Sequence, residues 1–329
     1  MRYKRILKVG RNCWHICRAN KVSFLIDGAA YFNALHDGLP LAEQQILILA
    51  WDIHSQLQLI PAHSKDGHPA PPTLGQLLDQ LVRHKPRLQV NILSWDFSLL
   101  LAMDRKWLPI YKLEWNTHYR LKFCLDDQYP LGASHHQKVV VIDDALAFAG
   151  GLDLTRGRWD TPEHRADDPR RQAVDDDELP LRPYHDVQMS VTGPVAAALG
   201  VLARERWRSA TNKRLPVPQS VPTEPWPADL TADIEAINVA IVRSEPAYGE
   251  LVEAREVEQL YLDSIAAAQS CIYIENQFFT SPLITMALAK RGLLTMLAVH
   301  IIPVAPFTII NLVAGASHIR FRDFVATPG

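Results

Sequence analysis

The chain has 329 residues, which is enough to bury a sizeable core in one large domain or in two. Its 34 basic and 36 acidic residues give a formal net charge of -2, so the overall charge does not attract nucleic acid, and an anionic substrate must meet local positive charge. The 4 cysteines are too few and too scattered for a disulfide framework or a zinc site, and the basic N-terminus lacks the apolar core of a secretory signal.

Helices and strands alternate in the first part of the chain. Apolar residues at helical spacing predict a helix over Ala29–Gln45, and the apolar run Ile46–Trp51 predicts a buried strand directly after it. Leu74–His84 has the pattern of an amphipathic helix, while Leu88–Trp95 and Leu121–Leu125 have the patterns of sheet strands. Alternation of this kind is typical of an α/β sandwich.

The stretch HHQKVVVIDDALAFAGGLD, which begins at His135, combines an interior strand with reactive side chains. His136 and Lys138 project from one face of this strand because side chains alternate with a period of two, and an imidazole beside an ammonium group suits a phosphate. A lone histidine on an apolar strand is usually a packed core residue, but the spacing to Lys138 and Asp143 favours chemistry. The small and acidic residues that follow are candidates for substrate binding: Gly150, Gly151 and Asp153.

The spacing His-x-Lys-x4-Asp, followed by Gly-Gly, resembles the signature of the phospholipase D superfamily. The longer text HHQKVVVIDDALAFAGGLDLTRGRWD resembles the first such motif of eukaryotic-type phospholipase D enzymes. The resemblance implies a phospholipase D-like α/β/α sandwich with a mixed sheet. It also implies a phosphoryl transfer in which His136 attacks phosphorus to form a phosphohistidine, Lys138 offsets the phosphate charge and Asp143 orients the histidine. This scheme needs no metal and no other cofactor.

Residues 161–184 are polar and charged without an apolar period, which predicts a surface loop, with a substrate lid as the alternative. Trp159-Asp160 before the loop and Tyr184–Val187 at its end resemble positions that flank the first motif in the same enzymes. We expect both segments to frame the pocket.

Further along the chain, Ala196–Ala210 predicts a helix, and the proline-rich residues 213–232 predict an irregular connector at a domain boundary. Glu250–Gln269 then predicts a helix and Cys271–Phe279 a strand. This strand resembles the third conserved block of phospholipase D enzymes, and the pair repeats the helix-strand order of the chain's beginning. The amides near the strand's end are candidates for phosphate binding, with a structural role as an equal alternative: Asn276 and Gln277.

No second His-x-Lys-x4-Asp occurs in the 329 residues, although the family's two-lobed fold implies one. Leu293–Ala316 is apolar and uncharged apart from His300, and is long enough for a membrane segment. Together with the residues after it, it resembles a fragment of the DedA-like, SNARE-associated (VTT) membrane family. Because Pro303 and Pro306 would break a spanning helix, we expect a re-entrant or broken membrane helix, with a soluble core helix as the alternative.

These patterns predict a first lobe over 1–212, the connector 213–232, an incomplete start of a second lobe over 233–290 and a membrane-type segment over 291–329. The expected function is a phospholipase D-type phosphodiesterase or phosphatidyltransferase acting on glycerophospholipids, associated with a membrane at its cytoplasmic face. Two alternatives stay open: an inactive, membrane-associated phosphate-binding protein, and a homodimeric single-motif phosphodiesterase or nuclease. The lack of a basic excess disfavours nucleic acid as a partner.

Overall fold

The computed structural model describes residues 6–61, 71–96, 115, 117–130, 133–171, 182–220, 222–249, 251–276, 279–291 and 295–297. Contacts divide the chain into two compact units, one of residues 16–239 and the other of residues 1–15 and 240–329. The boundary at 239–240 lies after the proline-rich connector that we expected between two lobes.

A mixed sheet is the centre of the larger unit. Its strands are β1 (His15–Ile26), β2 (Gln45–Ala50), β3 (Gln89–Trp95), β4 (Leu121–Asp126), β5 (Lys138–Ile142), β6 (Leu146–Gly150), β7 (Val187–Thr192) and β8 (Ile234–Ile241). In the part of the chain that the structure describes, they form one sheet in the order β4-β3-β2-β5-β6-β7-β1-β8. β2, β3 and β4 run parallel, whereas β5, β6, β7 and β1 each pair antiparallel with the strand before them in this order.

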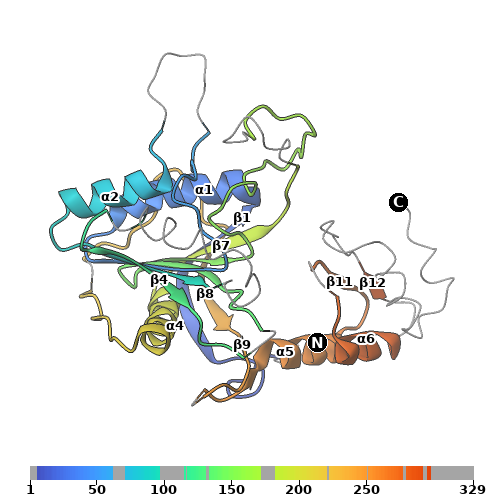
Figure 1. Ribbon diagram of the computed structural model, residues 1–329. Coiled ribbons are helices and arrows are strands. Elements are labelled where there is room, and N and C mark those ends of the chain that lie inside the picture. Colours follow the sequence, from blue (N-terminus) through green and yellow to red (C-terminus); the bar gives the residue numbers. More distant parts are fainter. Residues whose placement is uncertain are drawn as a thin grey trace, which may run out of the picture. The chain divides into compact units, whose positions relative to one another are not determined.

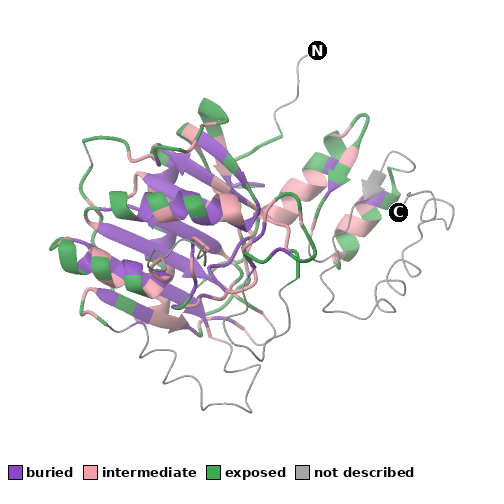
Figure 2. Ribbon diagram, turned by 90° about the horizontal axis from the view of Figure 1, so that it is seen from above, coloured by how far each residue is buried: buried purple, intermediate pink, exposed green. Residues whose placement is uncertain are grey.

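Helices cover both faces of this sheet (Figure 1). The helices α1 (Asp27–Gly38) and α2 (Leu74–His84) lie on one face, and α4 (Pro194–Thr211) lies on the other. The central strands β2 and β5 are buried along their whole length, and Figure 2 shows the sheet largely in purple. Their uninterrupted apolar runs therefore form strands that are covered on both faces. This layering confirms the predicted α/β class.

Local signals in the sequence explain where α2 begins and which face it buries. Thr73 and Gln76 form a capping box, in which each side chain accepts a hydrogen bond from the other residue's backbone N–H. The helix then buries one apolar face: Leu74, Leu77, Leu78 and Val82. Its bounds are those that the sequence predicts.

The smaller unit repeats an arrangement found in the larger one. After the short antiparallel pair β9 (Ser244–Glu245) and β10 (Ala254–Arg255), it contains α5 (Glu256–Ala267), β11 (Ile272–Ile274), α6 (Pro282–Ala289) and β12 (Thr295–Leu297). The strands β11 and β12 pair in parallel, as β2 and β3 do, and each pair has a helix between its strands. The order α5-β11-α6-β12 thus matches α1-β2-α2-β3, which extends the predicted duplication to a second helix and strand.

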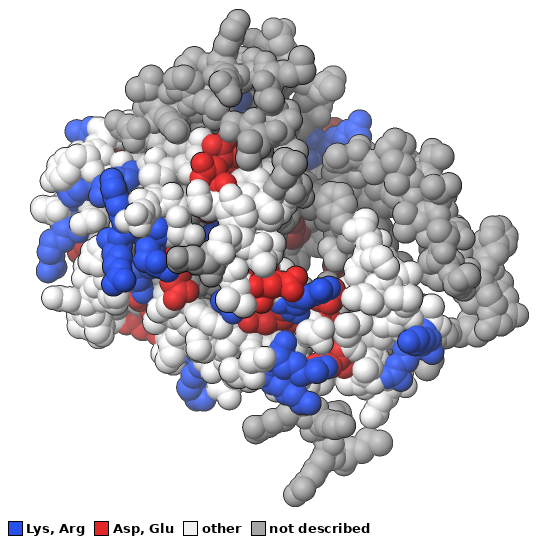
Figure 3. Space-filling model, turned by 60° about the horizontal axis from the view of Figure 1, so that its bottom comes forward, with Lys and Arg blue, Asp and Glu red and all other residues white. Residues whose placement is uncertain are grey.

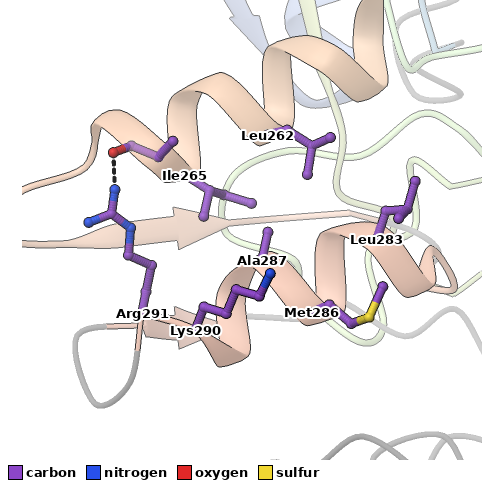
Figure 4. A pocket seen from close by; sticks show the side chains of 8 residues that line it. Leu262, Ile265, Leu283, Met286, Ala287, Lys290 and Arg291 are labelled. Carbon is purple, nitrogen blue, oxygen red and sulfur yellow. Dashed lines mark hydrogen bonds between the residues drawn. The ribbon is translucent and has the colours of Figure 1, made fainter.

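A groove of about 330 Å³ lies between α5 and α6 (Figure 4). Apolar side chains of both helices line it, with two basic residues at one end: Leu262, Ile265, Ala266, Leu283, Met286, Ala287, Lys290 and Arg291. The Arg291 guanidinium donates to the backbone oxygen of Ala266, which ties the end of α6 to α5.

Several boundaries differ from the predictions. The first helix begins at Asp27 and ends at Gly38, where a 3₁₀ turn containing Pro40 follows, because proline has no N–H to continue the helical ladder. The predicted strand 271–279 is limited to Ile272–Ile274. The long strand β1 has no clear alternation in its sequence and was not predicted.

The predicted membrane segment lies largely outside the described residues. Its described part, Thr295–Leu297, is the strand β12 rather than a helix. Among the described residues, no helix is long and apolar enough to cross a bilayer.

Candidate functional site

Two parallel strands of the larger unit end at a pair of tryptophans. Trp51 directly follows β2 and Trp95 is the last residue of β3, and their indoles stack with ring centroids 5.8 Å apart. Because β5 runs antiparallel to β2, its first residue, Lys138, lies at the same edge of the sheet. This edge, outside the carboxyl ends of parallel strands, is where ligands bind in open α/β sheets.

His136 lies at this edge, two residues before Lys138, and is exposed. Its imidazole meets the Trp51 indole edge to face, with ring centroids 5.7 Å apart. Partial desolvation, together with the positive charge of Lys138, lowers the pKa of His136 to about 4. The imidazole is therefore neutral at physiological pH. Its ring nitrogens have no hydrogen-bond partner among the described residues, so they are open to a ligand.

The Lys138 ammonium is buried beside the same indole, with Nζ 5.6 Å from the ring centroid. This Nζ lies 3.2 Å from Asp153 Oδ2 and donates to the backbone oxygen of His136 at 3.3 Å. Burial lowers the pKa of Lys138, and the charge of Asp153 opposes that shift. Burial likewise raises the pKa of Asp153, opposed by Lys138. The structure thus places a cation next to His136, as the shared strand face predicts.

Asp153 connects Lys138 to the backbone that follows β2. Its Oδ1 accepts the backbone N–H groups of Trp51 and Asp52, each at 3.1 Å, while Oδ2 faces Lys138. Only 3% of the residue is exposed. Both oxygens therefore face protein groups, and the predicted role of Asp153 in binding the substrate stays a prediction.

Gly150 and Gly151 are required by close packing against the neighbouring strand. A Cβ on Gly151 would lie 2.1 Å from Asp186 Oδ1, and one on Gly150 would lie 2.4 Å from both the Gln188 side chain and the Val187 backbone. Gly151 therefore makes room for Asp186 at the edge that holds Lys138, and Gly150 makes room for β7. Their predicted role in binding the substrate stays a prediction.

Asp143 lies at the other end of β5. It and Asp144 have positive φ angles of 50° and 54° in the tight turn to β6, a conformation that aspartate tolerates. Its carboxylate accepts three backbone N–H groups at the start of β2: those of Glu43, Gln44 and Gln45, at 2.6 to 2.9 Å. It lies five positions after Lys138, roughly 16 Å away at the usual rise per residue. Asp143 is a structural anchor, and we correct the expectation that it orients His136.

A second row of polar groups fixes Asp186. Asp27, whose φ of 66° is left-handed, donates its N–H to the Asp186 backbone oxygen at 2.9 Å. Asp27 Oδ1 accepts from His185 Nδ1 at 2.6 Å and from the Asp186 N–H at 3.3 Å. His164 lies beyond, with Nε2 3.5 Å from Asp27 Oδ2 and Nδ1 3.0 Å from Asp160 Oδ2. The segments predicted to frame the pocket meet here.

Three members of this row could hold a metal ion. Asp27, His164 and His185 each offer one ligand atom, and these atoms lie within 4.8 Å of one another. Two imidazoles and a carboxylate are common ligands of divalent transition metals. The phospholipase D-like scheme that the sequence implies needs no metal. These three residues are far apart in the chain, so no spacing motif identifies them.

Arg158 adds a second cation near the site. Its guanidinium lies 4.5 Å from the centroid of the Tyr184 ring, and the residue is half-buried. Its positive charge lowers the pKa of Lys138, although burial of Lys138 has the larger effect. A ligand phosphate near Lys138 would therefore also meet the field of Arg158.

The predicted amide pair is only partly described. Asn276 belongs to the smaller unit, where its Nδ2 donates to the Tyr261 hydroxyl at 3.4 Å. Gln277 lies outside the described residues. Their predicted role in binding phosphate stays a prediction.

Comparison with known proteins places these observations in a family. The chain matches the family model described as Phospholipase D over residues 118–305, more than half of its length and beyond the start of the segment that we expected to be membrane-type. Phospholipase D alpha 1 of Ricinus communis is 26% identical over 312 residues, covering 74% of this chain and 38% of that protein. Phospholipase D2 of Bos taurus is 25% identical over 322 residues, covering 78% of this chain and 33% of that protein.

The chain thus spans less than two fifths of the length of these relatives. Among solved structures, it is similar to the phosphatidylserine synthase of Haemophilus influenzae, at 15% identity and a TM-score of 0.46, over 88% of this chain and 65% of that one. It is also similar to Nuc of Salmonella typhimurium, at 12% identity and a TM-score of 0.36, over 59% and 100%. From the extent of the family match, the chain belongs to the phospholipase D family.

Proposed function

We propose that this chain carries the nucleophile of a phospholipase D-type phosphodiesterase or phosphatidyltransferase that acts on glycerophospholipids. The observation behind the proposal is the meeting of His136 and Lys138 at one Trp51 ring. His136 offers an open, neutral imidazole, and Lys138 offers a buried ammonium held by Asp153. A neutral imidazole can attack phosphorus, and a fixed cation stabilises the charge on the phosphate oxygens.

The reaction would proceed in two displacements. A ring nitrogen of His136 forms a bond to phosphorus while the bond between phosphorus and the headgroup oxygen breaks, and a general acid protonates the leaving oxygen. Water or an alcohol then attacks the phosphohistidine, the phosphorus–nitrogen bond breaks and the imidazole is restored. Water yields a phosphatidic acid, and an alcohol yields a new phosphodiester.

The proton donor is a second histidine in this scheme, and the 329 residues contain no second His-x-Lys-x4-Asp. A second copy of the chain would supply a second His136, and the negative charge of the bound phosphate would have to raise the pKa of that imidazole for it to carry the proton. Homodimerisation is therefore what this proposal predicts for the 329 residues acting on their own.

Charge favours a lipid over a nucleic acid as the substrate. The net charge is -2, and the face drawn in Figure 3 carries both basic and acidic groups. Nucleic-acid binding relies on many phosphate contacts by clustered basic residues. A single lipid phosphodiester carries one phosphate, for which the local cations Lys138 and Arg158 provide positive charge. The proposal includes that the protein reaches this lipid at a membrane surface.

The test uses purified chain and vesicles of phosphatidylcholine or phosphatidylglycerol. Release of the headgroup with formation of phosphatidic acid is expected, with loss of activity in His136→Ala and retention in His84→Ala, an exposed histidine on α2. Turnover is followed as a function of protein concentration, with light scattering to report the oligomer. No lipid turnover at any concentration, or faster cleavage of single-stranded DNA than of lipid, would overturn the proposal.

A further inference from the structure

The two residues beside His136 both reach the same buried ion pair. This pair joins Asp126, the last residue of β4, to Arg206 on α4, with Nη2 2.5 Å from Asp126 Oδ2. The side chains are 1% and 11% exposed. On one side, His135 Nε2 lies 3.3 Å from Asp126 Oδ2. On the other side, Arg206 Nη1 donates to Gln137 Oε1.

The contacts of His135 fix its tautomer and its ring. Its Nε2 also lies 3.1 Å from the backbone oxygen of Gln128. Because a carboxylate and a carbonyl can only accept, Nε2 must carry the proton. The ring packs edge to face on Tyr129, with centroids 5.5 Å apart, and Tyr129 in turn contacts Trp95. His135 is thus part of the scaffold that supports the tryptophan pair.

The His136 imidazole has no such hydrogen bonds to described residues, although the Lys138 ammonium donates to the His136 backbone oxygen. His136 precedes the first strand residue, so the sheet ladder does not hold it, and its ring nitrogens have no hydrogen-bond partner among the described residues. The position of its imidazole against Trp51 therefore depends on the backbone that His135 and Gln137 define. A misplacement of about 1 Å at a reacting group can cost about 100-fold in rate.

We propose that Arg206 is a positioning residue that holds His136 from both sides, through Asp126 and His135 before it and through Gln137 after it. This inference rests on the proposed role of His136 as the nucleophile. It predicts that loss of the guanidinium lowers kcat and leaves KM for the lipid almost unchanged, because the Arg206 side chain is only 11% exposed and its guanidinium is engaged by Asp126 and Gln137.

The same helix offers a matched control. Arg204 also forms a buried ion pair, with Nη2 2.7 Å from Asp144 Oδ2, but Asp144 lies in the turn beyond the far end of β5. Arg206→Ala is expected to lower kcat about 100-fold, whereas Arg204→Ala should keep the kcat of its folded fraction near that of the wild type. Gln137→Ala, which leaves the buried pair intact, should give a smaller loss in the same direction.

A second readout separates this inference from the proposed function. In protein labelled with ¹⁵N-histidine, the His136 ring signals are identified by their loss in His136→Gln. These signals should shift or broaden in Arg206→Ala and Gln137→Ala and stay unchanged in Arg204→Ala. Unchanged His136 signals in folded Arg206→Ala and Gln137→Ala would overturn the inference, as would equal losses of kcat in the two arginine variants. An inactive wild type would contradict the proposed function, while the ring signals would still test the positioning.

Discussion

The Lys138 ammonium lies 3.2 Å from the Asp153 carboxylate, and both side chains are at least 95% buried. Since Asp153 also accepts two backbone hydrogen bonds at the end of β2, one carboxylate fixes both the cation and the Trp51 backbone of the site. Removal of one member of a buried ion pair leaves an uncompensated charge, which is far more costly than the loss of an exposed pair.

Asp153→Asn should therefore lower the free energy of unfolding by about 3–5 kcal/mol. The matched control is Asp79→Asn, which removes an ion pair with Arg83 on the surface of α2 and should cost less than about 1 kcal/mol. Urea unfolding followed by circular dichroism measures both. Equal losses in the two variants would show that burial does not set the strength of the Lys138 pair.

Asp143→Asn tests whether the aspartate of the motif is structural. Asparagine tolerates the positive φ angle but has only one acceptor oxygen for the three backbone N–H groups at the start of β2. The free energy of unfolding should fall by about 1–3 kcal/mol, while the folded fraction keeps its lipid turnover. A folded Asp143→Asn protein without turnover would restore a direct role for this carboxylate.

Gly151→Ala tests the packing that makes room for Asp186. The added Cβ would lie 2.1 Å from Asp186 Oδ1, so this carboxylate must move or the strand pair must open. We expect a loss of stability of about 1–3 kcal/mol and a reduced kcat. Unfolding curves and lipid turnover of the folded protein measure these effects. Wild-type stability and wild-type turnover would contradict the predicted steric clash between the added Cβ at position 151 and Asp186.

The acid limb of the pH profile reports on His136. Partial desolvation and the charge of Lys138 lower the pKa of its imidazole to about 4, from an ordinary value of about 6.5. Only the neutral form attacks phosphorus, so protonation of the nucleophile should not slow the first displacement as the pH falls through about 6.5, and should slow it tenfold per unit below about 4. Rapid-quench kinetics measures this rate, with circular dichroism to confirm that the protein stays folded. A midpoint near 6.5 would show an ordinary imidazole.

The sequence predicts the elements that carry strong local patterns. The continuous apolar runs at 46–51 and 139–142 identify two central strands, and the amphipathic period of 74–84 identifies α2 with its bounds. The strand β1 is harder to predict because its sequence has no clear alternation of apolar and polar residues, and its place between β7 and β8 comes from long-range pairing.

Some features of the site follow from the local sequence, and others depend on the fold. The adjacency of His136 and Lys138 follows from the two-residue period of a strand. Trp51, Asp186 and Arg206 lie far from the motif in sequence, and only the strand order and the packing of α4 bring them to it. Asp143 occupies the position that the motif requires, but its carboxylate binds backbone N–H groups at the start of β2. A residue five positions along a strand from Lys138 lies at the opposite edge of the sheet.

The central claim is that His136 becomes covalently attached to phosphorus during turnover. The most direct measurement quenches the reaction of ³²P-labelled phospholipid with base, which preserves phosphohistidine, and locates the label by mass spectrometry of the peptides. The account predicts a base-stable, acid-labile label on His136 that is absent from His136→Ala and present in His84→Ala. Lipid turnover with no label on His136, or undiminished turnover in His136→Ala, would contradict it.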